Sequence, residues 1–273
     1  MTAETSGLSP ILAAFAVTAG LAAVHVFGGR LRLLSRVPRS RWLSAAGGTS
    51  VAYVFLHLLP EAEHFAASFP RLGGIGRPVY VFALLGVVAF YGLERFALRR
   101  GGDEPPGDNE VGRGEKDGPA PPPGVFWIHV GSFGLYNALI GYLLVRESVY
   151  GPGELALFAL AMGTHFLVND VGLREHHREL YRSTGRWILA GAAFAGWGVG
   201  VIVPLPAVVT GALFGFLCGA TVLNILKEEL PAQRESRFWA FALGAALFAA
   251  LLLALPTEES EREASSATRE ASP

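Results

Sequence analysis

Eight long apolar stretches run along this chain, separated by short polar or Gly/Pro-rich connections. An α-helix rises about 1.5 Å per residue, so about 20 residues span a hydrocarbon core about 30 Å thick. Most of the stretches reach that length, and the pattern therefore predicts an all-α polytopic membrane protein with eight transmembrane helices. Their approximate bounds are 8–28, 43–60, 78–98, 124–145, 153–172, 186–204, 205–226 and 238–256.

Basic residues are distributed unevenly among the connections. Most of the 22 Lys and Arg residues lie in or beside the first, third, fifth and seventh connections. Because cytoplasmic loops retain Lys and Arg, these connections are predicted to be cytoplasmic and both termini outside. No basic region precedes the first stretch, so we expect a retained helix rather than a cleaved signal peptide. We therefore expect a multi-pass protein of the cell (inner) membrane.

The composition leaves little length for a soluble domain, with 51% hydrophobic and 16% charged residues. Residues 99–123 and 257–273 are polar and rich in Gly, Pro, Ser or acid, and we expect both to be disordered. The first segment separates three helices (1–98) from five (124–256). The net charge of −1 argues against a nucleic-acid partner. The one cysteine, Cys218, excludes an internal disulfide.

The end of the second stretch carries polar residues at helical spacing. His57, Glu61 and His64 follow one another at four and three residues, so a helix places them along one stripe. Pro60 disturbs this regularity without ending the helix, because membrane helices tolerate proline kinks. Two imidazoles and a carboxylate are suitable ligands for a metal ion such as Zn²⁺. The alternative interpretation is an interfacial helix end with ordinary polar residues.

A second polar group lies deep in the fifth stretch. Counting about 1.5 Å per residue from Gly153 places His165 near the middle of the bilayer. His165 and Asn169 are one turn apart and share a face, whereas Asp170 points about 100° away. Ionisable residues at this depth are costly and mark a functional site by default. We predict a metal site or ion path here, with a hydrogen-bonded structural pair as the alternative.

Other polar residues inside the stretches have weaker functional signals. Asn137 and Tyr136 lie a little past the middle of the fourth stretch, and His129 lies near its cytoplasmic end. Asn and Tyr side chains hydrogen-bond between helices as often as they bind ligands. His25 and Asn224 are interpreted as core polar groups with satisfied hydrogen bonds.

The segment after the fifth stretch reads Arg174-Glu-His-His-Arg-Glu179. We interpret it as a solvated helix end, with a metal exit at His176 and His177 as the alternative. Its spacing differs from the His-Glu-x-x-His pattern of zinc proteases, and the chain has no Gly-x-Ser-x-Gly nucleophile elbow. We therefore expect no enzymatic activity.

Glycines recur at four-residue spacing in the sixth and seventh stretches. Lipid provides no hydrophobic drive for helix association, so small residues let helices approach closely and pack. These positions are predicted to be helix-packing seams; they are Gly196 and Gly200, and Gly211, Gly215 and Gly219.

The segment 45–62 resembles the second helix of the ZIP (Zrt/Irt-like) family of divalent-metal transporters, whose members often read Leu-His-Leu-Leu-Pro-Glu-Ala at the position of Leu56–Ala62. Gly92-Leu-Glu-Arg95 and Glu228-Glu-Leu-Pro231 are also similar to segments of that family. The resemblance implies eight helices in a three-plus-five arrangement, both ends outside, and a long cytoplasmic loop after the third helix.

The chain departs from the family pattern where ZIP transporters build a metal site on helices four and five. Asn137 and His165 match family ligand positions. Tyr136 stands where the family has histidine, Ile140 stands where it has a carboxylate, and Asn169 also replaces a carboxylate. Fewer carboxylates give less compensation for removing water from a divalent cation. The resemblance therefore implies one weak metal site rather than a binuclear one.

Three functions remain open from the sequence. The first is a carrier whose substrate is Zn²⁺ or a similar divalent ion. It would need no organic cofactor. The second is a transport-incompetent relative that serves as a membrane scaffold or sensor. The third is a haem protein with two histidine ligands, His25 and His129.

The expected partners are the lipid bilayer and the metal ion, and a homodimer is possible. In the first case the metal ligands are His57, Glu61 and His64 at the entrance, and Asn137, His165, Asn169 and Asp170 in the middle.

Overall fold

The computed structural model describes residues 5–28, 39–66, 69, 78–101, 123–147, 152–229 and 237–254. All regular structure in these ranges is helical. Most of the predicted disordered loop and the whole predicted tail lie outside the described residues. Residues 99–101 and Pro123 were predicted as part of that loop, but the first form the end of one helix and Pro123 begins the next. The all-α prediction is confirmed for the described chain.

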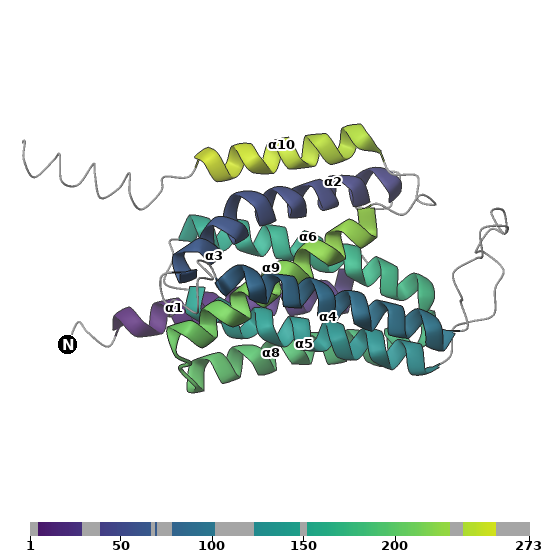
Figure 1. Ribbon diagram of the computed structural model, residues 1–273, viewed down its shortest axis with the longest axis horizontal. Coiled ribbons are helices and arrows are strands. Elements are labelled where there is room, and N and C mark those ends of the chain that lie inside the picture. The colour runs from purple at the N-terminus through teal and green to yellow at the C-terminus, as the bar shows by residue number, and fades with distance from the viewer. Residues whose placement is uncertain are drawn as a thin grey trace, which may run out of the picture.

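The helices alternate in direction along the long axis of the molecule (Figure 1). The N-terminus and the end of the last helix lie at the same end of the bundle, on the left of Figure 1. The elements, in order, are α1 (Thr5–Phe27), α2 (Arg39–Tyr53), η3 (Val54–Leu58), α3 (Leu59–Ala66), α4 (Pro78–Gly101), α5 (Pro123–Glu147), α6 (Pro152–His176), α7 (Arg178–Leu180), η4 (Tyr181–Gly185), α8 (Arg186–Ile202), α9 (Ala207–Glu229) and α10 (Phe238–Ala254).

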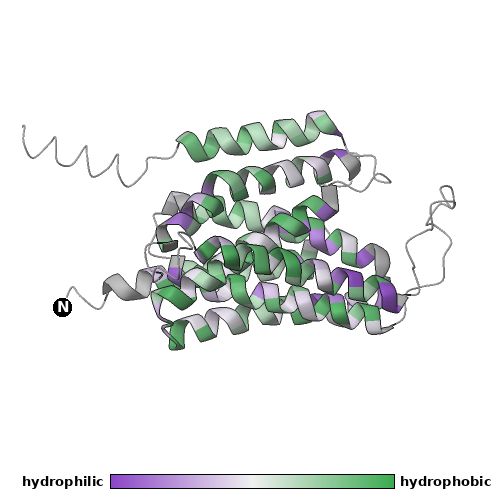
Figure 2. Ribbon diagram, viewed as in Figure 1, coloured by the Kyte–Doolittle hydropathy of each residue, from purple (hydrophilic) through white to green (hydrophobic). Residues whose placement is uncertain are grey.

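Hydrophobic residues cover most of the length of these helices (Figure 2). In the described chain, seven helical segments are long and apolar enough to cross a membrane, and α10 is a shorter apolar helix of 17 residues. The second segment runs without interruption through α2, η3 and α3. The protein is therefore a multi-pass membrane protein, and the eighth predicted stretch is present as this shorter helix.

We divide the helices of the bundle into two groups, although α6 contacts α2 of the second group at least as extensively as α1 of the first. The first group contains α1, α5, α6 and α8, and the second contains α2, α3, α4, α9 and α10. The main contacts between the groups join α2 to α6 and α4 to α5. The grouping cuts across the order of the chain, since α1 packs with the helices that follow the 102–122 segment. We call the boundary between the two groups the seam.

Three helix pairs pack through glycine on both partners: α2 with α10, α4 with α9, and α5 with α8. In every pair, the glycine of one helix lies against a backbone carbonyl of the other and leaves no room for a Cβ atom. Each glycine also follows by three residues the carbonyl that receives the partner's glycine, so one crossing geometry occurs three times. The contacts are Gly48 on Phe241 and Gly244 on Ala45; Gly86 on Phe216 and Gly219 on Ala83; Gly141 on Ala193 and Gly196 on Ala138.

The prediction that these glycines lie at close helix–helix contacts is confirmed. Besides Gly196 and Gly219, a Cβ at Gly200 would meet α5, one at Gly211 would meet Phe65, and one at Gly215 would meet α4. Close backbone approach is what makes these helices pack in lipid, where burial of apolar surface gives no advantage.

Pro60 determines the shape of the second membrane segment. Its ring has no N–H and would collide with the carbonyl four residues earlier in a regular α-helix. The preceding turn, η3, is instead π-helical, and the N–H of Leu59 bonds to the carbonyl of Val54, five residues back. The helix then continues as α3 to Ala66. The prediction that Pro60 disturbs the helix without ending it is confirmed, and the disturbance is a widened turn around His57.

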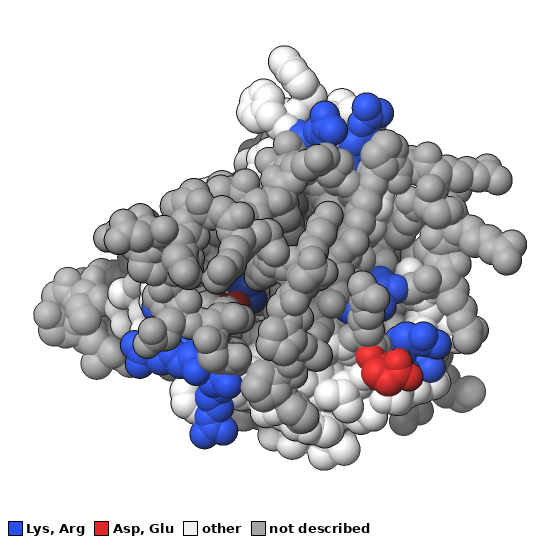
Figure 3. Space-filling view, turned by 90° about the vertical axis from the view of Figure 1, so that its right-hand side faces the viewer, with Lys and Arg blue, Asp and Glu red and all other residues white. Residues whose placement is uncertain are grey.

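Lys and Arg side chains occur at several places on the end of the bundle where α4 ends and α5 begins (Figure 3). Arg99 and Arg100 are in the last turn of α4, and Lys227 is in the last turn of α9. This is the end that the sequence predicts to be cytoplasmic, and we refer to it as the inner end.

Candidate functional site

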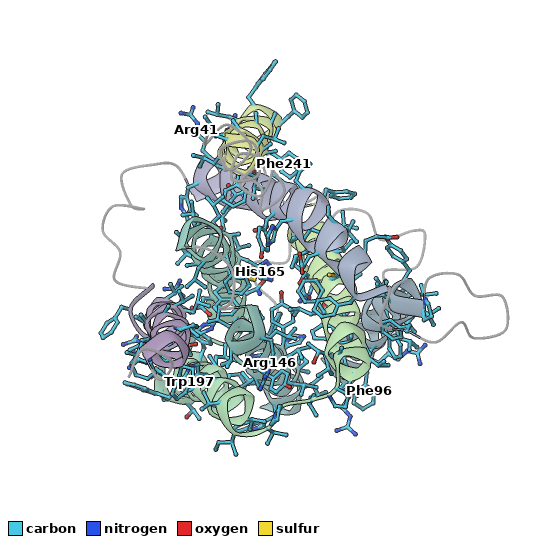
Figure 4. All side chains as sticks on the ribbon, turned by 90° about the vertical axis from the view of Figure 1, so that its left-hand side faces the viewer. Arg41, Phe96, Arg146, His165, Trp197 and Phe241 are labelled. Atoms are coloured by element: carbon cyan, nitrogen blue, oxygen red, sulfur yellow. The ribbon has the colours of Figure 1, made fainter. Side chains whose placement is uncertain are left out.

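His165 lies near the middle of the ring of helices when the bundle is viewed along its length (Figure 4). The side chain is 2% exposed, and the ring nitrogen Nε2 lies 3.1 Å from Nδ2 of Asn169, one turn further along α6. The ring of Tyr136, from α5, is 5.8 Å away between centroids. The prediction that His165 and Asn169 share one face of the helix is confirmed.

The hydrogen bond between these two residues leaves one polar atom unsatisfied. An amide nitrogen can only donate, so His165 Nε2 accepts this bond. Asn169 Oδ1 is buried and has no hydrogen-bond partner. A buried acceptor without a donor costs about 1–3 kcal/mol. The centre of α6 therefore holds two adjacent lone-pair atoms, one imidazole nitrogen and one amide oxygen, and one of them has nothing to bind.

Asp170, the next residue, faces a different helix. Its Oδ1 lies 2.8 Å from Nδ1 of His25 in α1, and Nε2 of the same histidine lies 2.8 Å from Oδ1 of Asn137 in α5. Asn137 Nδ2 in turn donates to the carbonyl of Phe133. The imidazole of His25 also stacks on Phe166, with centroids 4.6 Å apart. We call His25, Asp170 and Asn137 the His25 network; all three are at most 3% exposed.

The geometry fixes how many protons the His25 network holds. The carbonyl of Phe133 can only accept, so Asn137 Nδ2 points to it and Asn137 Oδ1 must accept from His25 Nε2. The other bond, between His25 and Asp170, also needs one proton. Whether that proton is on the ring or on the carboxyl, the His–Asp pair has no net charge. A neutral pair avoids the cost of burying a net charge at membrane depth.

The predicted central site is therefore divided in two. His165 and Asn169 form one group, and Asp170 and Asn137 belong to the His25 network. The interpretation of His25 as a satisfied core residue is confirmed. Its partners were not identified from the sequence, because Asp170 is 145 positions away and its place opposite α1 depends on helix packing. Since both ring nitrogens of His25 are hydrogen-bonded, neither is free to ligate a haem iron.

Tyr136 and Ile140 stand where the family resemblance placed metal ligands, and both serve packing here. The Tyr136 hydroxyl lies 2.7 Å from the Thr221 hydroxyl of α9, which bonds to the Leu217 carbonyl. Ile140 is 1% exposed and lies in the main hydrophobic core. These two positions therefore tie α5 into the bundle.

His57 in η3 and Glu61 in α3 belong to the second membrane segment. The His57 ring stacks on Tyr53 with centroids 5.0 Å apart, and both His57 and Glu61 are partly buried. His64 is in α3, but its side chain lies outside the described ones. No group of three His, Cys, Asp or Glu residues within the described ranges is placed to hold a metal ion.

The inner end holds a polar cluster that was only partly anticipated. His129 Nδ1 of α5 lies 3.3 Å from His177 Nε2, and His129 Nε2 lies 3.6 Å from a carboxylate oxygen of Glu94 in α4. The same oxygen accepts a hydrogen bond from Lys227 of α9. The prediction of a solvated helix end is wrong for His177, which is 6% exposed. The His176 side chain lies outside the described ones.

Comparison of the chain with protein-family models, with curated proteins and with solved structures finds no match in any of the three. The class that the structure defines is a multi-pass α-helical membrane protein with buried polar groups among its helices.

Proposed function

We propose that this protein carries a divalent metal ion, with Zn²⁺ as the first candidate, along the seam between its two helix groups. The central binding site is formed by His165 and Asn169. The observation that carries the proposal is the buried Asn169 Oδ1 without a hydrogen-bond partner, beside the lone pair of His165 Nε2. Rotation of the amide turns both lone pairs toward one cation.

The chemistry of this pair suits a passing ion rather than a stored one. Imidazole nitrogen and amide oxygen are acceptable Zn²⁺ ligands, and water fills the remaining coordination positions. Two neutral ligands bind a divalent cation weakly, because no carboxylate offsets the loss of its water. Weak binding permits release, which a carrier requires.

The arrangement of helices also supports a carrier. His165 and Asn169 belong to α6, which contacts helices of both groups, and glycine contacts join α5 to α8 in one group and α2 to α10 and α4 to α9 in the other. A rigid-body movement of one group against the other would expose the central pair to each side in turn. His57 and Glu61, with His64 of the same helix, are proposed as the entrance. The likeness of Leu56–Ala62 to ZIP transporters agrees with this placement.

Zn²⁺ uptake into vesicles tests the proposal directly. Purified protein is reconstituted with a Zn²⁺-sensitive dye inside, and initial rates are compared for the wild type, His165→Ala and Asn169→Leu. We expect uptake above that of empty vesicles, and a loss of at least 10-fold in both variants. Leu160→Ala is the matched control, since Leu160 is on the same helix and 48% exposed. Uptake that is unaffected in both variants contradicts the site, and absence of uptake by the wild type contradicts the function.

A second candidate is a scaffold or sensor that does not transport. It is favoured by the engagement of Asp170 and Asn137 with His25, and by the packing roles of Tyr136 and Ile140. This candidate predicts no heat of Zn²⁺ or Cd²⁺ binding in calorimetry of the wild type. It also predicts binding by the triple variant Tyr136→His, Ile140→Glu and Asn169→Glu, which restores the ligand types that the resemblance implies.

A further inference from the structure

A pocket of about 350 Å³ opens at the inner end between α4, α5 and α9, and we propose that it binds an oxyanion, the phosphate group of an anionic lipid or free phosphate. His165 does not line this pocket, which lies at the inner end of the seam where α4 meets α5. Its polar lining residues are Glu94, Arg95, His129, Ser132, Asn224 and Lys227.

Two nitrogen atoms at this pocket have no hydrogen-bond partner. Asn224 is 4% exposed, and its Nδ2 is buried without an acceptor. His129 Nε2 is likewise buried and unbonded, since the nearest carboxylate oxygen of Glu94 is 3.6 Å away. An amide nitrogen is a donor, and His129 Nε2 is a donor when its Nδ1 accepts from His177. A ligand that supplies oxygen acceptors would satisfy both atoms.

The charges around the pocket favour an anion. Glu94 is the one acidic residue among the described lining residues, and Lys227 already binds its carboxylate. Arg95 adds a positive charge that this pair does not cancel. A phosphate group can accept hydrogen bonds from Lys, Arg and neutral donors together, and such charge-assisted bonds are about twice as strong as neutral ones. A metal cation, in contrast, would have to displace the Lys227 ammonium from Glu94.

The walls of the pocket indicate where an anion of this kind would come from. Phe90, Tyr91, Leu98 and Leu223 make most of its lining apolar, and Tyr91 and Leu98 are exposed on α4. On a membrane helix, exposed apolar residues face acyl chains. Basic pockets between membrane helices bind the headgroups of anionic lipids. A lipid could therefore place its phosphate among the polar residues and its chains along α4, whereas free phosphate would use the polar residues alone.

Native mass spectrometry and calorimetry on the full chain in detergent test the proposal. Native mass spectrometry compares retention of phosphatidylglycerol with that of phosphatidylcholine. Calorimetry measures the binding of inorganic phosphate. Preferential retention of phosphatidylglycerol supports the lipid as source, and phosphate binding without lipid preference supports the free anion. If neither ligand binds, the proposal is overturned.

Three variants then assign the binding to this pocket. Asn224→Leu removes one donor, and we expect about 10-fold weaker binding. Glu94→Gln removes the negative charge and releases Lys227, so we expect tighter binding; a cation site would respond in the opposite direction. Arg100→Gln is the control, because Arg100 is exposed at the end of α4 outside the pocket. Weaker binding in Glu94→Gln, or an equal effect of Arg100→Gln and Asn224→Leu, would overturn the assignment.

Discussion

Two neighbouring residues of α6, Asn169 and Asp170, belong to regions with opposite properties. Asp170 is part of the His25 network, in which both ring nitrogens, the carboxylate and the amide all have partners. Asn169 faces the other way, beside His165, and its amide oxygen has none. Both residues are buried to a similar extent, so burial alone does not distinguish a polar group that is fully hydrogen-bonded from one that is not.

The difference follows from where each side of α6 packs. On the His25 side, α6 contacts α1, a member of its own group, and there both ring nitrogens of His25 are hydrogen-bonded. α6 also contacts α2 and α9 of the other group, and beside His165 lies the ring of Tyr136 from α5. Under the proposed carrier function the two groups move against each other, so bonds across the boundary such as Tyr136–Thr221 would have to break, and an acceptor without a donor is compatible with such a boundary. The following predictions test this contrast, from the largest effect to the smallest.

Replacing Asp170 should cause the largest loss of stability. Asp170→Ala leaves His25 Nδ1 buried without its partner, and removing one member of a buried pair costs about 3–5 kcal/mol. Unfolding in a mixed-micelle denaturant titration measures this loss. Asp170→Asn keeps an oxygen acceptor and serves as the control with a smaller effect. A wild-type midpoint for Asp170→Ala would show that the His25 network is not structural.

Gly196→Ala should lower the stability of the protein by disturbing the packing of α8 on α5, the helix that carries Asn137 of this network. The new Cβ would collide with the carbonyl of Ala138, next to Asn137, and overpacking costs about 1–3 kcal/mol. Gly198→Ala on the same helix is the matched control, because a Cβ there meets nothing within 4 Å. The same titration compares the two. Equal midpoints for both variants would contradict the close packing of α5 on α8.

Tyr136→Phe tests a bond that crosses between the helix groups. The change removes the hydroxyl that bonds to Thr221, while Thr221 keeps its bond to the Leu217 carbonyl. We expect a loss of about 1 kcal/mol in the unfolding titration. Tyr91→Phe, at a side chain that is 56% exposed, should have no effect. If Tyr136→Phe lowers the free energy of unfolding more than Asp170→Ala does, the His25 network is not the more stabilising of the two contacts.

Asn169→Leu should have the smallest effect on stability and yet abolish uptake. It removes the unsatisfied Oδ1 but takes away the donor to His165 Nε2, so one buried acceptor without a partner replaces another. The net change is expected to stay within about 1 kcal/mol. Unfolding and vesicle uptake are measured on the same preparation. A large loss of stability would place Asn169 with the structural residues.

Parts of the candidate site were predictable and others were not. The spacing of His165, Asn169 and Asp170 correctly divided them between two faces of one helix, because side-chain direction repeats with the helical turn. The effect of Pro60 was also predictable in kind, since its missing N–H must disturb the turn before it. The partners of Asp170 and of Glu94 were not, because His25 and Lys227 lie on helices more than 100 positions away.

The sequence by itself determined the helices of this protein and its membrane character. Hydropathy, proline and glycine act on neighbouring residues, so their effects can be read along the chain. Only the tertiary structure decided which buried polar atoms have partners. Those pairings depend on how far each helix is rotated and shifted against the next, and in this bundle the three glycine crossings fix three of those rotations.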